Sequence, residues 1–349
     1  MELRKVQESA GAIFDEAGVV LDFDNSKALD AINNNVAICD RSHWGLLKIT
    51  GEDRLRYLHN QSTNDFEKLK PGQACDTVFV TSTARTLDLA TAYVTEDAVL
   101  VLVSPNRREQ LLTWLDRFIF PFDKVELADI SADFAIFSLL GEQSDSLLSK
   151  LTSEAISLEK LAAHSLVNIA EVPVRVAQGS GLATPGYTLI VDSNRAAPVW
   201  SKICEMGAVP IGDRQWENLR IQEGRPVPDR ELTEDYNPLE AGLWQTISFE
   251  KGCYIGQETI ARLNTYNGVK QRLWGIKLSQ PVSPQTLITF EDSKIGILTS
   301  YVDTSSGYFG LGYVRTKAGG EGLKVQIGQA QGELVAVPFV HHPSTTTNS

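Results

Sequence analysis

Cys253 lies in the stretch KGCYIGQETIARL (251–263), where its neighbours favour a reactive thiol. Gly252 and Gly256 leave the backbone free to bend and to approach a ligand closely. Lys251 brings a positive charge, and a helix predicted to begin near Gly256 brings the positive end of its dipole, so both favour a thiolate. The alternative is a small apolar residue packed in a turn, which is the usual role of a free cysteine.

The other three cysteines, Cys39, Cys75 and Cys204, adjoin apolar runs and are interpreted as packed small hydrophobes. No two cysteines form a C-x-x-C pair or a tight cluster, which argues against a disulfide framework and a dedicated metal site. The sequence therefore predicts a reducing compartment and no metal centre, with Cys253 as the candidate functional thiol.

Positive charge gathers around this cysteine in a chain that is acidic overall. The formal net charge of the chain is −12, whereas residues 251–277 carry five basic residues and one acidic residue. Trp244, Tyr254, Tyr266 and Trp274 are interleaved with these charges. Cations beside flat aromatic rings suit an anionic ligand with a planar ring. A solvated basic face over core aromatics is the competing interpretation.

A carboxylate and the histidines are weaker candidates. Glu240, in NPLEAGLW (237–244), could accept two ring N–H donors of a ligand, but an acid at a helix N-terminus after Pro238 explains it equally well. His43 and His59 are interpreted as hydrogen-bonded structural histidines rather than ligands.

Composition excludes several classes of function. The negative net charge argues against nucleic acid or an anionic membrane as the main partner. The longest apolar run, AVLVLV at 98–103, is far too short to cross a bilayer. Seven acidic residues among the first thirty argue against a secretory signal and against an uncleaved transit peptide.

The predicted elements form an α+β body followed by a β-barrel. The stretches 46–58 and 134–151 each read as a strand, a glycine turn and a helix, which hints at an internal duplication. A hairpin is predicted over 86–103, a helix from Ser104-Pro105, and a second helix from Asp213 to Gly224. Short strands separated by turn residues from about Lys270 predict a small all-β barrel.

Several blocks of the sequence resemble one family. KGCYIGQE (251–258) resembles the signature of the YgfZ-type folate-binding proteins, which support iron–sulfur cluster assembly. They belong to the superfamily of the glycine-cleavage T-protein (GcvT), a tetrahydrofolate-dependent aminomethyltransferase. Further blocks resemble the superfamily in order, and two runs look most like its plastid and cyanobacterial branch. The blocks are 40–66, 220–244 and 295–314, and the runs are 77–94 and 256–273.

The resemblance implies an α+β fold of three domains arranged like a clover leaf around a central folate-binding channel. The first two domains would interleave along the chain, as 1–48 plus 131–208 and 49–130 plus 209–268. Residues 269–340 would form the C-terminal β-barrel, and 341–349, with His341 and His342, a disordered tail.

The resemblance also implies the site. Cys253 would be the residue most tied to function, although no mechanism is assigned to it, with Lys251 and Tyr254 as the other catalytic candidates. The motif and the basic, aromatic segment together give the candidate folate-binding residues, with tetrahydrofolate or a derivative as the cofactor. These residues are Glu240, Trp244, Gly252, Gly256, Gln257, Glu258, Arg262, Arg272 and Trp274.

Three differences separate this chain from the aminomethyltransferases. Their hairpin usually carries Gly-Gly and a paired Asp-Asp, whereas ARTLDL (84–89) keeps only Asp88, which is interpreted as a strand-edge or turn carboxylate. Their R-x-E-A-G stretch reads RIQEG (220–224) here. Their signature usually has Phe at the position of Tyr254 and lacks the cysteine. The differences predict that folate binding is kept and aminomethyl transfer is lost.

Two functions from different classes follow from the resemblance. The first is a folate-dependent accessory factor for iron–sulfur cluster assembly or repair that uses Cys253, with assembly factors or client [4Fe-4S] enzymes as partners. The second is a folate-dependent aminomethyl or one-carbon transferase, and a folate-binding module without chemistry is a third alternative. The predicted location is the plastid stroma, after removal of a transit peptide, or a bacterial cytoplasm.

Overall fold

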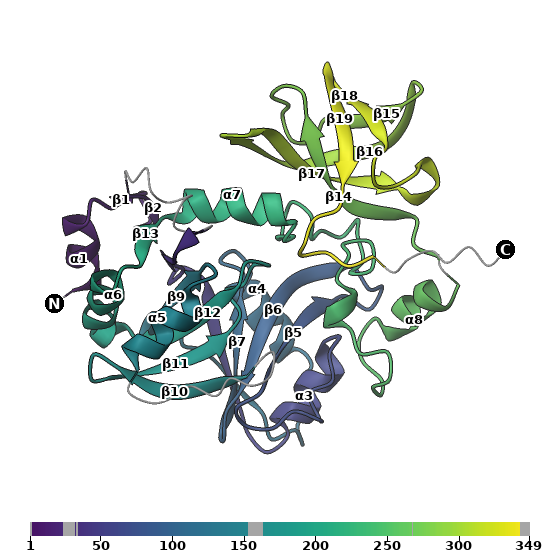
Figure 1. The fold of residues 1–349 in the computed structure, drawn as a ribbon. Coiled ribbons are helices and arrows are strands. Elements are labelled where there is room, and N and C mark those ends of the chain that lie inside the picture. The colour runs from purple at the N-terminus through teal and green to yellow at the C-terminus, as the bar shows by residue number, and fades with distance from the viewer. Residues whose placement is uncertain (1, 24–31, 33, 153–162, 267, 343–349) are drawn as a thin grey trace. The chain divides into compact units, whose positions relative to one another are not determined.

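The computed structural model describes residues 2–23, 32, 34–152, 163–266 and 268–342, and the chain divides into two compact units (Figure 1). One unit comprises Met1–Leu55, Lys68–Cys75 and Thr91–Leu219, and the other Arg56–Glu67, Asp76–Ala90 and Arg220–Ser349. Both units are built from segments that alternate along the chain. The three-domain boundaries given above stay a prediction.

The first unit contains a six-stranded sheet with the strand order β10-β11-β12-β9-β3-β13. All neighbours pair antiparallel except β13 and β3, which are parallel. Trp200 of α6 is fully buried in its core, with its ring centroid 5.1 Å from that of Phe137 on β9. The strands are β3 (Ala37–Asp40), β9 (Phe134–Leu140), β10 (His164–Ile169), β11 (Val172–Gln178), β12 (Gly186–Asp192) and β13 (Val209–Ile211). The other elements are α1 (Leu3–Ser9), β1 (Ile13–Phe14), β2 (Val20–Asp22), α5 (Ser144–Leu151) and α6 (Ala196–Glu205).

A five-stranded sheet has the order β5-β6-β7-β4-β8, and it contains the predicted β6–β7 hairpin. Its strands are β4 (Gly45–Thr50), β5 (Ala74–Val80), β6 (Thr86–Val94), β7 (Ala98–Val103) and β8 (Glu126–Asp129). The helix after the hairpin begins later than predicted, because α4 spans Arg108–Asp116. The Ser104 carbonyl accepts the N–H of Arg107 in a turn, so Ser104-Pro105 precede the helix instead of opening it.

The predicted strand–glycine–helix repeat is confirmed. β4 is followed by Gly51 and α3 (Arg54–Gln61), and β9 is followed by Gly141 and α5. Both glycines have a positive φ, 99° and 131°. A Cβ on Gly51 would lie 1.9 Å from the Lys124 carbonyl oxygen, and one on Gly141 would lie 2.3 Å from that of Asn35. Both turns therefore require glycine for the same two reasons.

The predicted C-terminal barrel is also confirmed. Six strands close in the order β14-β17-β16-β15-β18-β19 around an apolar core. The strands are β14 (Gln271–Leu278), β15 (Leu287–Phe290), β16 (Ser293–Thr304), β17 (Gly307–Arg315), β18 (Lys324–Ile327) and β19 (Ala330–Val335). The helix α7 (Asp213–Glu223) precedes it in the chain and ends at Gly224, as the sequence indicated.

Two residues of the predicted disordered tail are ordered, because they bind backbone groups. The N–H of His341 donates to the Gly242 carbonyl, and the ring of His342 packs 5.5 Å from that of Trp274. His342 Nε2 lies 2.8 Å from the Leu273 carbonyl oxygen. Residues 343–349 lie outside the described residues.

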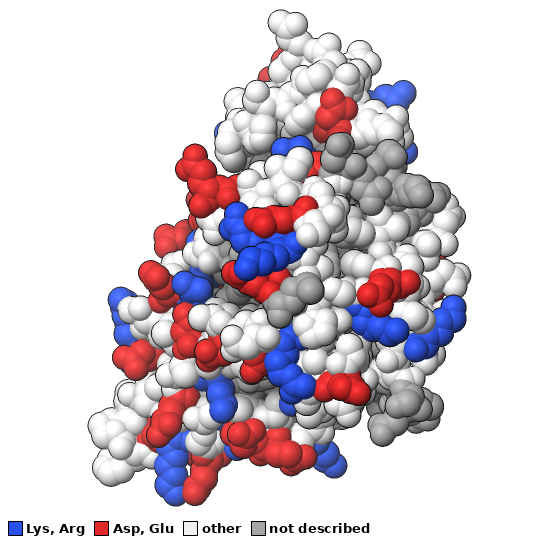
Figure 2. Space-filling view, turned by 90° about the vertical axis from the view of Figure 1, so that its left-hand side faces the viewer, with Lys and Arg blue, Asp and Glu red and all other residues white. Residues whose placement is uncertain are grey.

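The charged side chains on the face drawn in Figure 2 are interspersed, with basic and acidic groups side by side. Among the described residues, no helix is both long enough and apolar enough to cross a membrane.

Candidate functional site

The helix predicted after the cysteine is α8, which spans Gln257–Thr265. Gly256 precedes it with φ 82°, and a Cβ there would lie 2.9 Å from the Thr81 carbonyl oxygen, so this position requires glycine. Ile260 is fully buried, and Leu263 packs against the same core. The start of α8 is therefore fixed, and the cysteine lies in the loop before it.

Lys251 holds one end of this loop. Its side chain is buried, and Nζ donates to the carbonyl oxygens of His59, Ser62 and Asn64, the last two at 2.8 and 2.7 Å. These carbonyls belong to the end of α3 and the residues after it, where unpaired carbonyls and the helix dipole favour a cation. Because an ammonium group has three N–H donors, these contacts use all of them. Lys251 was a catalytic candidate, and its geometry is that of a residue that positions the loop.

The other end of the loop is held by a backbone hydrogen bond. The N–H of Ile255 donates to the Asn60 carbonyl at 3.0 Å. Tyr254 lies between the two ends, half-buried, with its ring centroid 4.6 Å from Lys251 Nζ. Burial raises the pKa of Tyr254 to about 12, so its hydroxyl stays protonated at neutral pH. Cys253, midway between the two ends, is exposed.

The four cysteines differ in exposure. Cys39 is buried, Cys75 and Cys204 are partly buried, and Cys253 is exposed. Burial raises the pKa of the Cys39 thiol well above its ordinary value and that of Cys204 to about 12. These two thiols are therefore poor nucleophiles at neutral pH.

His59 lies beside the loop, which sequence reasoning missed. Its side chain is 7% exposed, and Nδ1 lies 3.1 Å from Asp65 Oδ1. A Cβ on Gly252 would lie 3.6 Å from His59 Nε2. Burial and the charge of Lys251 lower the pKa of His59, and the carboxylates of Glu67 and Asp65 offset only part of this shift. The imidazole is therefore neutral at neutral pH. Nδ1 lies at ion-pair distance from Asp65 but forms no hydrogen bond within the described residues, so the hydrogen-bonded structural role stays a prediction. No spacing in the sequence indicated a neighbour almost two hundred residues away.

Glu240 and Trp244 are the folate candidates that precede the loop. Glu240 Oε2 accepts the N–H of Asn237, and Asn237 Oδ1 accepts the N–H groups of Leu239 and Glu240. This reciprocal arrangement is that of a capping box, but residues 238–242 form turns, so the helix expected after Pro238 is absent. Burial raises the pKa of Glu240, although the hydrogen bond from the Asn237 N–H and the positive charge of Arg85 each lower it. Trp244 Nε1 is buried and has no hydrogen-bond partner within the described residues. An acceptor atom of a bound ligand would satisfy this donor by accepting a hydrogen bond from it.

Asp88 is placed differently from the prediction. It is fully buried in β6, which lies between β5 and β7, so it is neither a strand-edge nor a turn carboxylate. Burial lowers the pKa of Arg225, and the nearby negative charge of Asp88 partly offsets this shift. A buried carboxylate needs such a partner, because an uncompensated charge in the interior is costly.

The remaining candidates are spread over α8 and the barrel. Gln257 and Glu258 lie in the first turn of α8, and Arg262 is exposed in its last turn. Arg272 is half-buried on β14, where burial lowers its pKa. Trp274 packs on His342.

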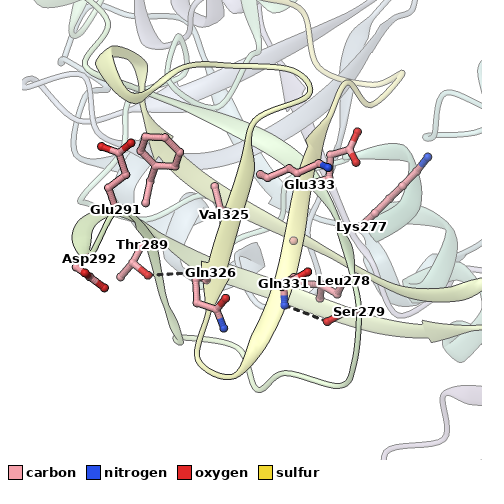
Figure 3. Close-up of a pocket in the computed structure, with 13 residues that line it drawn as sticks. Lys277, Leu278, Ser279, Thr289, Glu291, Asp292, Val325, Gln326, Gln331 and Glu333 are labelled. Carbon is pink, nitrogen blue, oxygen red and sulfur yellow. Dashed lines mark hydrogen bonds between the residues drawn. The ribbon is translucent and has the colours of Figure 1, made fainter.

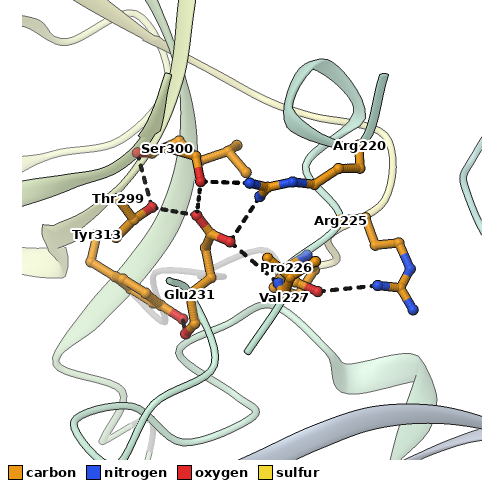
Figure 4. A network of polar contacts seen from close by, with 9 residues as sticks. Arg220, Arg225, Pro226, Val227, Glu231, Thr299, Ser300 and Tyr313 are labelled. Carbon is orange, nitrogen blue, oxygen red and sulfur yellow. Dashed lines mark hydrogen bonds and ion pairs between the residues drawn. The ribbon is translucent and has the colours of Figure 1, made fainter. Parts of the chain in front are cut away.

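A fully buried polar network fixes the segment that leads to the cysteine loop (Figure 4). Arg220 Nη1 donates to Glu231 Oε2 at 2.9 Å, and Ser300 and Thr299 donate to Glu231 Oε1 at 2.6 and 2.7 Å. The Tyr313 hydroxyl donates to the Glu231 carbonyl at 2.7 Å. Because both carboxylate oxygens are satisfied, the buried charge is tolerated, and the segment after α7 is tied to β16 and β17.

A groove of about 820 Å³ opens on the barrel (Figure 3). It is lined by β14, β15, β18 and β19 and carries charges of both signs, including Lys277 and Lys324 beside Glu291 and Glu333. None of the predicted site residues lines it. The described residues also contain no group of three metal-ligating side chains.

Comparison with known proteins assigns the chain to a family. The model of the GCVT N-terminal domain matches residues 24–251, more than half of the chain. The chain therefore belongs to the GCVT family, within the aminomethyltransferase superfamily.

Individual relatives agree with this assignment. The chain is 44% identical over 347 residues to "Putative transferase At1g60990, chloroplastic" of Arabidopsis thaliana, which covers 97% of this chain and 80% of the relative. It is 27% identical over 324 residues to an aminomethyltransferase of Halalkalibacterium halodurans, covering 89% and 88%. The crystal structure of the glycine cleavage system aminomethyltransferase T from Bartonella henselae superposes with a TM-score of 0.83, at 19% identity and 97% coverage of both chains. That superposition confirms the predicted GcvT-like fold.

Proposed function

We propose that this chain is a YgfZ-type, folate-binding accessory protein that supports iron–sulfur cluster assembly or repair, with Cys253 as its functional thiol. The observation that carries the proposal is the loop 251–255. Lys251 and Ile255 fix its two ends, and the thiol between them is exposed. A structural cysteine would be buried, as Cys39 is. The signature KGCYIGQE supports the same assignment.

Tetrahydrofolate or a derivative is the proposed cofactor, since members of the GCVT family use it. Two residues fit such a ligand: Trp244 offers a buried donor without a partner, and Glu240 offers a buried carboxylate. The cofactor, when bound, would carry a one-carbon unit. Gly252, Gly256, Gln257, Glu258, Arg262, Arg272 and Trp274 remain proposed folate contacts.

The proposed location is the plastid stroma, because the Arabidopsis relative is named as chloroplastic. The proposed partners are iron–sulfur assembly factors or client [4Fe-4S] enzymes.

Complementation tests the role of the thiol. A strain deficient in iron–sulfur clusters would express the wild-type chain, Cys253→Ala, or Cys204→Ala as a matched control. The activity of its [4Fe-4S] enzymes would then be measured. Wild type and Cys204→Ala should restore the activity, and Cys253→Ala should not. Full rescue by Cys253→Ala, at equal protein levels, would contradict the proposal.

Calorimetry tests the folate. Tetrahydrofolate with one and with three glutamates should bind saturably, and the triglutamyl form should bind more tightly because each glutamate adds negative charge for basic residues such as Arg262 and Arg272 to meet. The difference should shrink as salt is added, since salt screens exposed charges. No saturable binding of either form would contradict the folate proposal.

The second candidate is an aminomethyl or one-carbon transferase. It is favoured by the many relatives named as aminomethyltransferases and by the shared fold. The lack of the paired Asp-Asp of the aminomethyltransferases in ARTLDL (84–89) counts against it, because only Asp88 remains there. Exchange activity with glycine and a lipoyl carrier protein would favour this candidate over the first.

A further inference from the structure

A second cavity, of about 310 Å³, is lined by residues of β10, β11 and β12, which run side by side in the six-stranded sheet, and by Leu100 of β7 (Figure 1). All of its lining residues belong to the first unit, whereas the cysteine loop belongs to the other. Its volume lies at the lower end of the range of about 300–1,000 Å³ that is typical of small-molecule sites. Leu100, Val172 and Ile190 give it a buried apolar lining.

Arg175 brings a positive charge to this apolar lining. On β11 it pairs with Leu166 of β10 and with Ile190 of β12. Residues that pair directly across strands lie on the same face of a sheet, and all three line the cavity. Arg175 is half-buried. A partly desolvated guanidinium therefore lies between two apolar side chains in the cavity wall.

Arg175 has no negatively charged partner among the described residues. Its Nη1 donates to His164 Nδ1 at 2.9 Å, and that ring is neutral, because burial and the charge of Arg175 lower the pKa of His164 to about 4. Burial lowers the pKa of Arg175, and the charge of Asp97 offsets only part of this shift. Because arginine stays protonated in proteins, the wall carries a half-buried cation without an ion pair. An anion in the cavity would compensate that charge.

The other charged residues of the lining limit the charge of a ligand. Arg195 adds a second positive charge, with Nη2 donating to the Glu171 carbonyl at 2.8 Å. Asp192 adds a negative charge, and its Oδ1 accepts the N–H of Asn194. With Arg175, the lining carries two positive charges and one negative charge, which suits a ligand with a single negative charge better than a dianion such as phosphate. A carboxylate also matches the planar fork of an arginine.

We propose that this cavity binds a monocarboxylate with a short aliphatic chain, such as an eight-carbon fatty acid. The carboxylate accepts hydrogen bonds from the Arg175 guanidinium, and the chain lies on Leu100, Val172 and Ile190, where it is removed from water. The site depends neither on folate nor on Cys253.

Calorimetry of the purified full chain with sodium octanoate tests this proposal. Octanamide keeps the chain without the charge, and acetate keeps the charge without the chain. Octanoate should bind saturably at one site, and each of the other two should bind at least about tenfold more weakly. No saturable binding of octanoate would overturn the proposal. Equally tight binding of octanamide or of acetate would overturn the assigned ligand class.

Two substitutions test the location of the site. Arg175→Gln removes the cation and should weaken octanoate binding by about tenfold or more, because hydrogen bonds to charged groups are the strong ones. Leu166→Glu places a carboxylate directly opposite Arg175, where it competes with the ligand for the guanidinium, and it should weaken binding by a similar factor. The matched control is Leu287→Glu, at another exposed leucine, on β15 in the other unit, and it should bind as wild type does.

Leu166 is 61% exposed, so Leu166→Glu should fold normally, and it decides the question if circular dichroism shows that Arg175→Gln does not fold. Octanoate binding that is unchanged in folded Leu166→Glu would place the ligand elsewhere and overturn the proposal. Equal loss of binding in Leu166→Glu and Leu287→Glu would overturn it as well, since an added negative charge anywhere on the chain would then explain the effect.

Discussion

At the scale of single residues, Lys251 has a different role in the structure from the one that its sequence position suggested. Its charge beside a cysteine predicted activation of the thiol. The structure places its ammonium group on three backbone carbonyls instead, which fixes the loop. The carbonyls that it binds belong to residues 59–64, and nothing in the local sequence indicated this contact.

Replacing Lys251 by Met should destabilise the unit that contains it. The change leaves the carbonyls of His59, Ser62 and Asn64 without their charged donor, and hydrogen bonds to charged groups contribute about 1.5–3 kcal/mol each. The free energy of unfolding in urea should fall by about 3 kcal/mol. Lys277→Met, at an exposed lysine of the barrel groove, is the control and should change it little. Equal stability of the two variants would show that the three contacts contribute nothing.

Asp88→Asn should act through stability and not through proton transfer. The differences from the aminomethyltransferases predict that this change leaves function nearly intact, but the structure buries Asp88 with Arg225 as a charge partner. Removing one charge of a buried pair costs about 3–5 kcal/mol. We expect a lower melting temperature and less folded protein in cells. Normal stability with lost activity would contradict this view and favour the transferase alternative.

At the scale of elements, sequence patterns predicted what local chemistry decides. The turns at Gly51 and Gly141, the helix after Gly256 and the closed barrel are confirmed, because each depends on glycine conformation or on alternating apolar residues. The predicted start of α4 at Ser104-Pro105 was wrong, because a serine followed by a proline can also form a turn before a helix.

The arrangement around the cysteine could not be predicted in the same way. The loop and its thiol follow from the signature, but their contacts with residues 59–64 join positions far apart in the chain. Asp88 and the Arg220–Glu231 network were missed for a related reason: burial of a charged residue is decided by its partner, which local sequence does not reveal.

The two glycines of the signature should differ in their tolerance of a side chain. Gly256 has φ 82° and no room for a Cβ, whereas a Cβ on Gly252 would make a normal contact with His59. Gly256→Ala should lower the free energy of unfolding by about 1–3 kcal/mol, and Gly252→Ala should lower it by less than about 0.5 kcal/mol. Urea unfolding of the two variants side by side measures the difference. Equal losses would mean that the turn at Gly256 adapts.

At the scale of the whole molecule, each unit contains a histidine that favours its neutral form in the folded chain, the buried His164 and the half-buried His342. His164 accepts a hydrogen bond from Arg175 at 2.9 Å in one unit, and His342 lies against the Leu273 carbonyl in the other. The main cause is burial, and it lowers the pKa of both from 6.5 to about 4. Both rings are therefore neutral in the folded chain at neutral pH.

Acid should therefore destabilise the protein between pH 6.5 and about 4. In this window the unfolded chain binds a proton at each histidine and the folded chain does not, so stability falls as the pH falls. For the buried His164 the loss is at most about 3 kcal/mol, at 1.36 kcal/mol per pKa unit. In His164→Gln, whose amide oxygen can still accept from Arg175, the melting temperature should fall less between pH 7 and 4.5 than in wild type. His43→Gln serves as the control, and an equally steep fall in His164→Gln and wild type would show that His164 does not govern acid stability in its unit.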